Sequence, residues 1–411
     1  MKQQRFRFKL LALLLFGMFA LLAAYGGYSI LTNGSRWFAS SHNPRLRAQK
    51  QQVTAGKITD RDGMVLAQTD AEGNRVYAES ESVRRAVVHV VGDADGHVRN
   101  GVESFQARYL YGFEASVFER IGDLISGAEH TGDTVQLTLS APLCEAVAAS
   151  FVRTCGAEAK GAAVVMDYRT GEVLAMVSLG SYDPMDTASS PTADRTRNRA
   201  TAGLYAPGEA FGPVTAACML AEGQALPDGS LAGAEASVTD RKLRETAETF
   251  GYNDNVLFRD LIVENAVYPT DGSAADHAAG RGGILATPVH LCMMAAGIAN
   301  DGTIMEPRLL LRVTSAAGAN RLGFSSAEYR RPLSPESAAA LKARLAREPM
   351  QGGITGIACV SDGTAIFVGY LDTESLPYAV CVVVEGGSAD QARTVAQETA
   401  NRIRERFGAI R

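Results

Sequence analysis

The chain has 411 residues, of which 46% are hydrophobic and 21% charged, and this composition is typical of a globular protein long enough for two domains. Its net charge of -5 and its dispersed basic residues exclude the basic stripe that nucleic-acid-binding proteins carry. The histidines are scattered and neither Cys-x-x-Cys nor His-x-x-x-His occurs, so we expect no metal site and no cofactor.

The N-terminus has the pattern of a membrane anchor. Residues 1–9 contain four basic side chains and no acidic one, and residues 10–31 form an uncharged, mostly apolar run long enough to cross a bilayer. The positive-inside rule predicts a cytoplasmic tail at 1–9, a single transmembrane helix at 10–31 and an extracytoplasmic location for the rest. A cleaved signal peptide is the alternative, but the apolar run is long for a signal core and no small-x-small cleavage site follows it.

Residues 32–135 contain few long apolar runs, and their short motifs are separated by Gly and Asp. This pattern predicts a small domain of strands and turns, with a hairpin turn at Asp62-Gly63.

The remaining residues, 136–411, predict helices that cover an antiparallel sheet. The Gly132–Leu139 segment alternates apolar residues and predicts a strand, and a helix from Ala141 to about Arg153 follows it. Two apolar runs around Gly171 predict a buried hairpin, Thr287 and Pro288 predict a helix start, and residues 390–407 predict a terminal helix.

Two apolar runs near the C-terminus, 364–370 and 378–385, predict further strands. Cys359 and Cys381 would lie on neighbouring strands of this arrangement, where they could pair or remain free. Cys218 and Cys292 lie in apolar helical stretches and are predicted to be small core residues.

Several of these segments, in this order, resemble the class B penicillin-binding proteins. The segment Gly56–Ala67 is similar to the signature that opens their extracytoplasmic part, Gly132–Leu139 to the start of their catalytic domain, and the hairpin at 161–178 to its first strands. The resemblance runs from about residue 44 to the C-terminus. It implies a pedestal domain at 32–135, a transpeptidase-like domain at 136–411 with the α+β penicillin-binding protein/serine β-lactamase-like fold, and a role in peptidoglycan synthesis.

The segment Asn198–Gly212 resembles the family's nucleophile segment, in which Tyr-x-Pro-Gly leads into Ser-Thr-Phe-Lys. Here Glu209 stands at the position of the serine nucleophile and Gly212 at that of the lysine. A carboxylate at the start of a helix is stabilised in its charged form and acts as a cap, and a glycine supplies no base. This segment, Asn198–Gly212, is called the elbow below, and its role is predicted to be structural.

The other two motifs of the family are also altered. No Ser-x-Asn occurs between residues 216 and 280, which predicts that the second motif is deleted, and the only such triplet is Ser41-His42-Asn43, beside the membrane. The third motif, Lys-Thr-Gly, reads Ile354-Thr355-Gly356, so an isoleucine replaces the lysine. Arg281 stands where the family has Gln in a Gly-Gln-Gly loop of the cleft.

The resemblance leaves two main hypotheses of function. The first is a catalytically inactive member that binds or regulates a cell-wall synthase or a membrane glycosyltransferase, with a peptidoglycan stem peptide as another ligand. The second is an active D,D-transpeptidase or carboxypeptidase with a different nucleophile, for which Thr239 with Lys242 is the only candidate pair. His277 could act as a general base with Asp276 as its partner in new chemistry, but an exposed loop histidine is usually solvated. A decaying gene copy without a role is a third reading.

Overall fold

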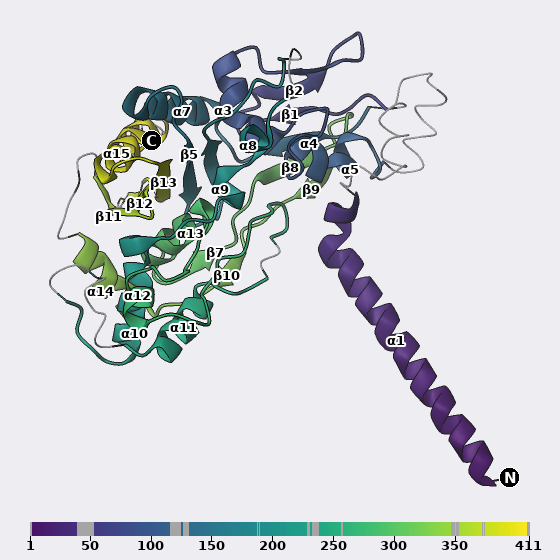
Figure 1. Cartoon of the computed structure of the whole chain (residues 1–411). Helices are drawn as coiled ribbons and strands as arrows, with labels where there is room; N and C mark the ends of the chain where they lie inside the picture. Colours follow the sequence, from purple (N-terminus) through teal and green to yellow (C-terminus); the bar gives the residue numbers. More distant parts are fainter. Residues whose placement is uncertain are drawn as a thin grey trace.

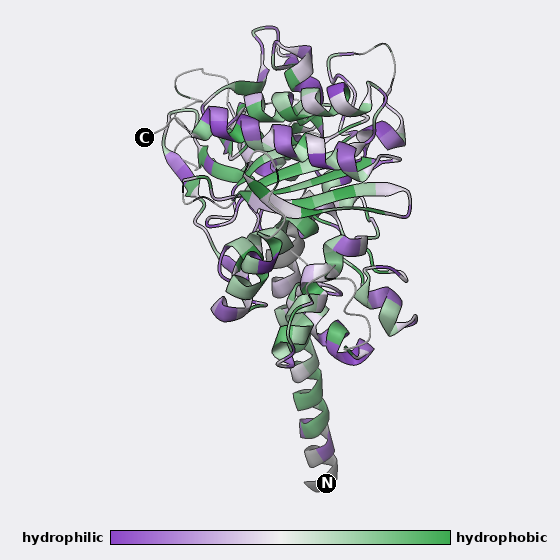
Figure 2. Cartoon of the chain, turned by 90° about the vertical axis from the view of Figure 1, so that its left-hand side faces the viewer, coloured by the Kyte–Doolittle hydropathy of each residue, from purple (hydrophilic) through white to green (hydrophobic). Residues whose placement is uncertain are grey.

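A computed structural model describes residues 2–38, 53–115, 125, 131–186, 188, 190–227, 231, 238–255, 258–346, 350, 353–371, 373 and 375–408. The helix α1 (Lys2–Phe38) projects from the folded part of the chain (Figure 1). Within it, Lys9–Ser29 is apolar and long enough to cross a membrane. Its side chains are exposed and almost uniformly hydrophobic (Figure 2).

The predicted antiparallel sheet is confirmed. Its five strands lie in the order β11-β12-β13-β5-β6, with every neighbouring pair antiparallel. The strands are β5 (Gly161–Asp167), β6 (Val173–Ser178), β11 (Ile354–Ser361), β12 (Thr364–Leu371) and β13 (Tyr378–Glu385).

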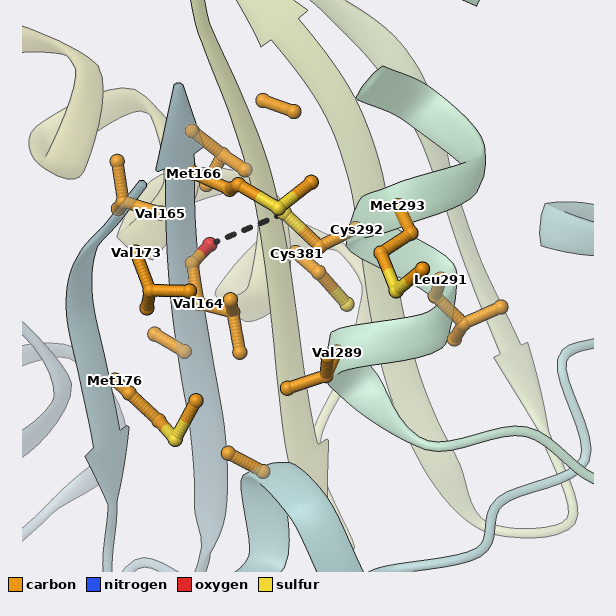
Figure 3. Close-up of a cluster of buried hydrophobic side chains, with 14 of the residues drawn as sticks. Val164, Val165, Met166, Val173, Met176, Val289, Leu291, Cys292, Met293 and Cys381 are labelled. Carbon is orange, nitrogen blue, oxygen red and sulfur yellow. Dashed lines mark hydrogen bonds between the residues drawn. The ribbon is translucent and has the colours of Figure 1, made fainter. Parts of the chain in front are cut away.

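Helices cover both faces of this sheet, so its central strands read as continuous apolar runs. The helices α7 (Ala141–Cys155) and α15 (Ala389–Phe407) pack on one face, and α13 (Pro288–Ala299) packs on the other (Figure 1). All three match predicted helices. Figure 3 shows α13 against β5 and β13, where Cys292 donates a weak hydrogen bond from Sγ to the Val164 carbonyl oxygen at 3.8 Å.

A second sheet contains strands from both sides of the expected boundary at 135/136. Its order is β3-β2-β1-β4-β8-β9, and β4 lies parallel to β1 and antiparallel to β8. The strands are β1 (Ile58–Thr59), β2 (Val65–Thr69), β3 (Arg75–Tyr77), β4 (Thr134–Leu137), β8 (Leu310–Thr314) and β9 (Asn320–Gly323). The predicted hairpin at Asp62-Gly63 joins β1 to β2, with Gly63 at φ +89.

The remaining elements are short. Two strands, β7 (Ile304–Met305) and β10 (Glu328–Arg330), pair with each other. The other helices in the described part of the chain are α3 (Glu81–Val91), α4 (Val102–Phe105), α5 (Ala107–Leu110), α8 (Ala193–Thr196), α9 (Arg199–Ala202), η1 (Gly208–Phe211), α10 (Gly212–Ala221), α11 (Asp240–Thr249), α12 (Ala274–Ala278) and α14 (Pro335–Leu345).

The cysteines correct one prediction and confirm another. Cys359 and Cys381 do not lie on neighbouring strands, because β12 runs between β11 and β13. All six cysteines are free. Cys218 and Cys292 are buried core residues, as their apolar surroundings predicted.

Candidate functional site

The elbow is a short, tightly held path between two helices. Asn198 caps α9, since its side chain accepts a hydrogen bond from the Ala200 N–H. The chain then pairs with the segment before α13, where Tyr205 and Ala286 exchange backbone hydrogen bonds of 3.0 and 2.9 Å. It turns at Gly208, φ +54, into η1 and then into α10. The residues aligned with the nucleophile motif therefore start a helix, as the resemblance implied.

The elbow is fastened to the loop that contains Arg281. The Gly208 N–H donates to the Gly280 carbonyl oxygen at 3.0 Å, and Thr215 Oγ1 donates to the Ala278 carbonyl oxygen at 2.8 Å. Gly280 has φ +68, and a Cβ there would lie only 2.2 Å from the Gly208 carbonyl oxygen. Glycine is required here because the backbones approach so closely.

At the nucleophile position, the Glu209 side chain is exposed in the first turn of η1, and Gly212 is buried where α10 begins. Among the described residues, no side chain is hydrogen-bonded to the Glu209 carboxylate. A carboxylate is a weaker nucleophile than a serine activated by a lysine, and no lysine stands one turn after Glu209.

The residues of the third motif lie at the start of β11, opposite Leu371, Tyr370 and Gly369 of β12. Ile354 is completely buried, whereas Thr355 and Gly356 are partly exposed.

The elbow itself meets β11 further along the strand. Cys359 Sγ donates a hydrogen bond to the Pro207 carbonyl oxygen at 3.4 Å, and a Cβ on Gly208 would lie 2.8 Å from Ser361 Cβ. Burial raises the pKa of the Cys359 thiol to about 11, although the backbone amide of Ala210 lowers it in part. A thiol with so high a pKa is not a nucleophile at neutral pH.

Apolar packing fills the space beside the elbow. Ala210 and Pro213 face Ile357 of β11 and Val368 of β12 around a cavity of about 10 Å³. That volume is no more than one water molecule needs. The interface between η1, α10 and β11 is therefore closed at this point.

His277 corrects the sequence-based picture of an exposed loop histidine. It is fully buried on α12, and its Nδ1 lies 2.5 Å from Asp240 Oδ1, which also accepts a hydrogen bond of 2.6 Å from the Tyr268 hydroxyl. Its partner is thus Asp240 and not Asp276. The 37 positions that separate Asp240 from His277 left no local signal for this pairing.

Arg281 and Asp276 stay at the surface. Arg281 Nε lies 4.0 Å from Asp276 Oδ1, and more than half of each side chain is exposed. Such an exposed pair contributes little to stability, and it leaves a cation on the loop beside the elbow.

The candidate pair for an alternative nucleophile does not assemble. Thr239 is the exposed N-cap residue of α11, and the Lys242 ammonium forms its ion pair with the Glu222 carboxylate. Lys242 is therefore not placed to act as a base for Thr239. The triplet Ser41-His42-Asn43 lies outside the described residues, and so do 228–230, 232–237 and 256–257 of the stretch expected to have lost the second motif.

Sequence reasoning missed a buried ion network that anchors the elbow. The Arg199 side chain is 1% exposed, with Nε 3.0 Å from Glu385 Oε1 and Nη2 2.5 Å from Asp194 Oδ1. The Tyr205 hydroxyl donates to the same Glu385 oxygen at 2.7 Å. The only sequence signal was an arginine in a helical turn otherwise made of small residues.

Comparison with known proteins agrees with this geometry. Residues 161–236 and 230–405 match the family described as the penicillin binding protein transpeptidase domain. The chain is 25% identical to the peptidoglycan D,D-transpeptidase PbpA of Mycolicibacterium smegmatis, across 85% of this chain and 87% of that protein. It is 26% identical to PbpA of Mycobacterium tuberculosis, across 83% and 84%.

Solved structures share the fold. Penicillin-binding protein A from M. tuberculosis, as an imipenem acyl-enzyme complex, superposes with a TM-score of 0.75 at 24% identity, covering 86% of this chain and 99% of that one. A D,D-transpeptidase domain from Eggerthella lenta gives a TM-score of 0.71 at 24% identity, covering 87% of this chain and all of that one. The chain belongs to the penicillin-binding protein transpeptidase family.

Proposed function

We propose that this chain is a membrane-anchored penicillin-binding-protein-like protein of cell-wall synthesis that forms no acyl-enzyme and acts by binding. Its ligand would be a cell-wall synthase or membrane glycosyltransferase, or a peptidoglycan stem peptide. The family's fold and the apolar helix support the membrane and cell-wall setting.

The observation that carries the proposal is the chemistry at the elbow. Acyl transfer requires a nucleophile with a base in hydrogen-bonding reach. Here Glu209 stands at the nucleophile position, Gly212 offers no base, and Ile354 is buried where the family has a lysine. The thiol that does contact the elbow, Cys359, is held protonated by its burial.

The organisation of the chain follows the same proposal. The basic tail at 1–9 would remain in the cytoplasm and residues after 31 would lie outside. The pedestal would occupy 32–135 and the transpeptidase-like domain 136–411, within which the residues of the family match lie.

Covalent labelling tests the proposal directly. The full-length protein in detergent micelles is incubated with a fluorescent penicillin and resolved under denaturing conditions, beside a relative known to form an acyl-enzyme. We expect a labelled band for the relative alone. A labelled band for this chain, with the acylated peptide located by mass spectrometry, would establish the rival hypothesis of an active enzyme with another nucleophile.

The binding role needs its own test. Crosslinking in intact membranes followed by purification of this chain should recover a synthase or glycosyltransferase of the cell wall. Recovery of this chain alone, across crosslinkers of several lengths, would argue against a regulatory partnership.

A further inference from the structure

A cavity of about 660 Å³ lies between α3, α7 and the end of β6. Cavities of this size commonly hold small ligands. It lies at β6, whereas the elbow packs on β11, and these two strands are the opposite edges of the five-stranded sheet. The cavity is therefore distinct from the site at the elbow.

The cavity combines an apolar floor with charges of both signs. Ala86 of α3, Ala148 of α7 and Val177 of β6 are among its apolar lining residues. Charged side chains around them include Arg195 and Lys160 as cations and Glu158 as an anion. A ligand that carries both a cation and an anion could contact charges of both signs in this cavity at once.

Two of the charges are available to a ligand. Lys160 is occupied, with Nζ 2.8 Å from Asp194 Oδ2, and Glu145 accepts a hydrogen bond from Ser82 Oγ. Arg195 and Glu158 are exposed, and neither side chain has a hydrogen-bonding or ionic partner among the described residues. They offer one guanidinium and one carboxylate to the same cavity.

One wall of the cavity is fixed by the buried Arg199. Its Nη1 donates to the carbonyl oxygens of Leu179, at 3.1 Å, and Asp194, at 3.2 Å, and its Nη2 pairs with the Asp194 carboxylate. Leu179 and Asp194 both line the cavity. A wall held from within in this way is formed before a ligand arrives, which lowers the entropic cost of binding.

We propose that this cavity binds a short peptide with a free ammonium group and a free carboxylate. The carboxylate pairs with Arg195, for which planar bidentate recognition is favourable. The ammonium group pairs with Glu158, and small apolar side chains lie on the alanine-lined floor. The proposal does not depend on whether the elbow can be acylated, so it and the penicillin result can fail separately.

Isothermal titration calorimetry tests this with the full-length protein in detergent micelles and the tetrapeptide Ala-Ala-Ala-Ala as the probe, whose only charges are its terminal ammonium group and carboxylate. We expect saturable binding at one site. Acetylation of the probe's N-terminus or amidation of its C-terminus should each weaken binding about tenfold, since each removes a charge-assisted contact.

Two variants assign the contacts. Arg195→Gln should weaken binding of the unmodified probe about tenfold, and this variant should bind the amidated and unmodified probes equally. Glu158→Gln should also weaken binding of the unmodified probe about tenfold, and it should bind the acetylated and unmodified probes equally. Because both side chains are exposed, folding should be unchanged, which circular dichroism checks. Arg241→Gln, at a highly exposed arginine on α11, is the matched control and should bind as the unmodified chain does.

Absence of saturable binding by the unmodified chain would overturn the proposal. An unchanged affinity in both cavity variants would also overturn it. Loss of binding in Arg281→Gln alone would overturn it too, because the peptide would then bind at the loop beside the elbow.

Discussion

Cys359 of β11 and Pro207 of the elbow are joined by a thiol-to-carbonyl hydrogen bond of 3.4 Å. The strand that carries the third motif thus closes on the elbow through a buried, protonated sulfur. A neutral donor at this contact stabilises the backbone of the elbow and supplies no nucleophile.

Restoring the family's residues should not restore acylation. The triple variant Glu209→Ser, Gly212→Lys, Ile354→Lys regains a serine and two lysines, but the second motif is still missing from the sequence. Ile354 is completely buried, so a lysine there should also destabilise the fold by several kcal/mol, about 3 or more. Fluorescent penicillin should give no band with this variant or with the single Glu209→Ser variant, which changes only an exposed side chain. A band would contradict the interpretation that the second motif is lost.

The Cys359 thiol should resist alkylation in the folded protein. With a pKa of about 11, only about one thiol in a thousand is ionised at pH 8, and burial blocks access as well. Cys155, half-buried at the end of α7, should react with iodoacetamide well before Cys359. Peptide mass spectrometry after timed labelling measures the order, and a denatured sample in which every cysteine reacts is the control. Equal rates in the folded state would show that the elbow opens readily.

Removing the buried arginine should cost far more stability than removing an exposed one. Arg199→Met leaves Glu385 without its cation and leaves Asp194 with Lys160 alone, and we expect a loss of about 3 kcal/mol in the free energy of unfolding. Arg241→Met breaks an exposed i,i+4 pair and should cost about 0.5 kcal/mol or less. Urea denaturation followed by circular dichroism compares them. Similar midpoints for both variants would mean that the network does not anchor the elbow.

Two glycines with similar backbone angles should differ in their tolerance of a methyl group. Gly280 and Gly318 have φ +68 and +83, so alanine strains both by about 1 kcal/mol. Only Gly280 is crowded, because its Cβ would lie 2.2 Å from the Gly208 carbonyl oxygen, whereas nothing lies within 4 Å of a Cβ at Gly318. Gly280→Ala should therefore lose about 2 kcal/mol more than Gly318→Ala. Equal thermal midpoints would disprove the tight contact between loop and elbow.

Stability should fall as the pH drops below neutrality. Burial lowers the pKa of His89 and of His290 to about 4. The unfolded chain, with histidines near pKa 6.5, therefore binds more protons, and stability is lost as the pH falls from about 6.5 to 4. At pH 5 each histidine should account for a loss of about 2 kcal/mol. Burial raises the pKa of Asp260 to about 6, which acts in the opposite sense, since its destabilising effect grows as the pH rises from about 4 to 6.

The variant His290→Gln separates these effects. Glutamine can still donate to the Phe250 carbonyl oxygen that His290 Nε2 contacts at 2.8 Å, but it does not titrate. Its free energy of unfolding should fall by about 2 kcal/mol less than that of the unmodified chain between pH 7 and pH 5. Parallel pH profiles would show that His290 titrates normally.

The sequence by itself determined the elements whose pattern is local. The hairpin around Gly171, the helix start at Thr287-Pro288 and the apolar helix near the N-terminus follow from periodicity, capping and length, and each is present in the structure. The order of the family motifs also indicated the fold, and the substitutions at Glu209 and Gly212 were readable without coordinates.

Only the tertiary structure decided which distant side chains meet. The His277 pairing with Asp240, the separation of Cys359 from Cys381 by a strand, and the burial of Arg199 against Glu385 all join residues whose spacing has no period. Such contacts depend on strand order and on how loops cross, and neither leaves a mark in the neighbouring sequence. The chemistry of the elbow could thus be read from the chain, but the contacts that hold it in place could not.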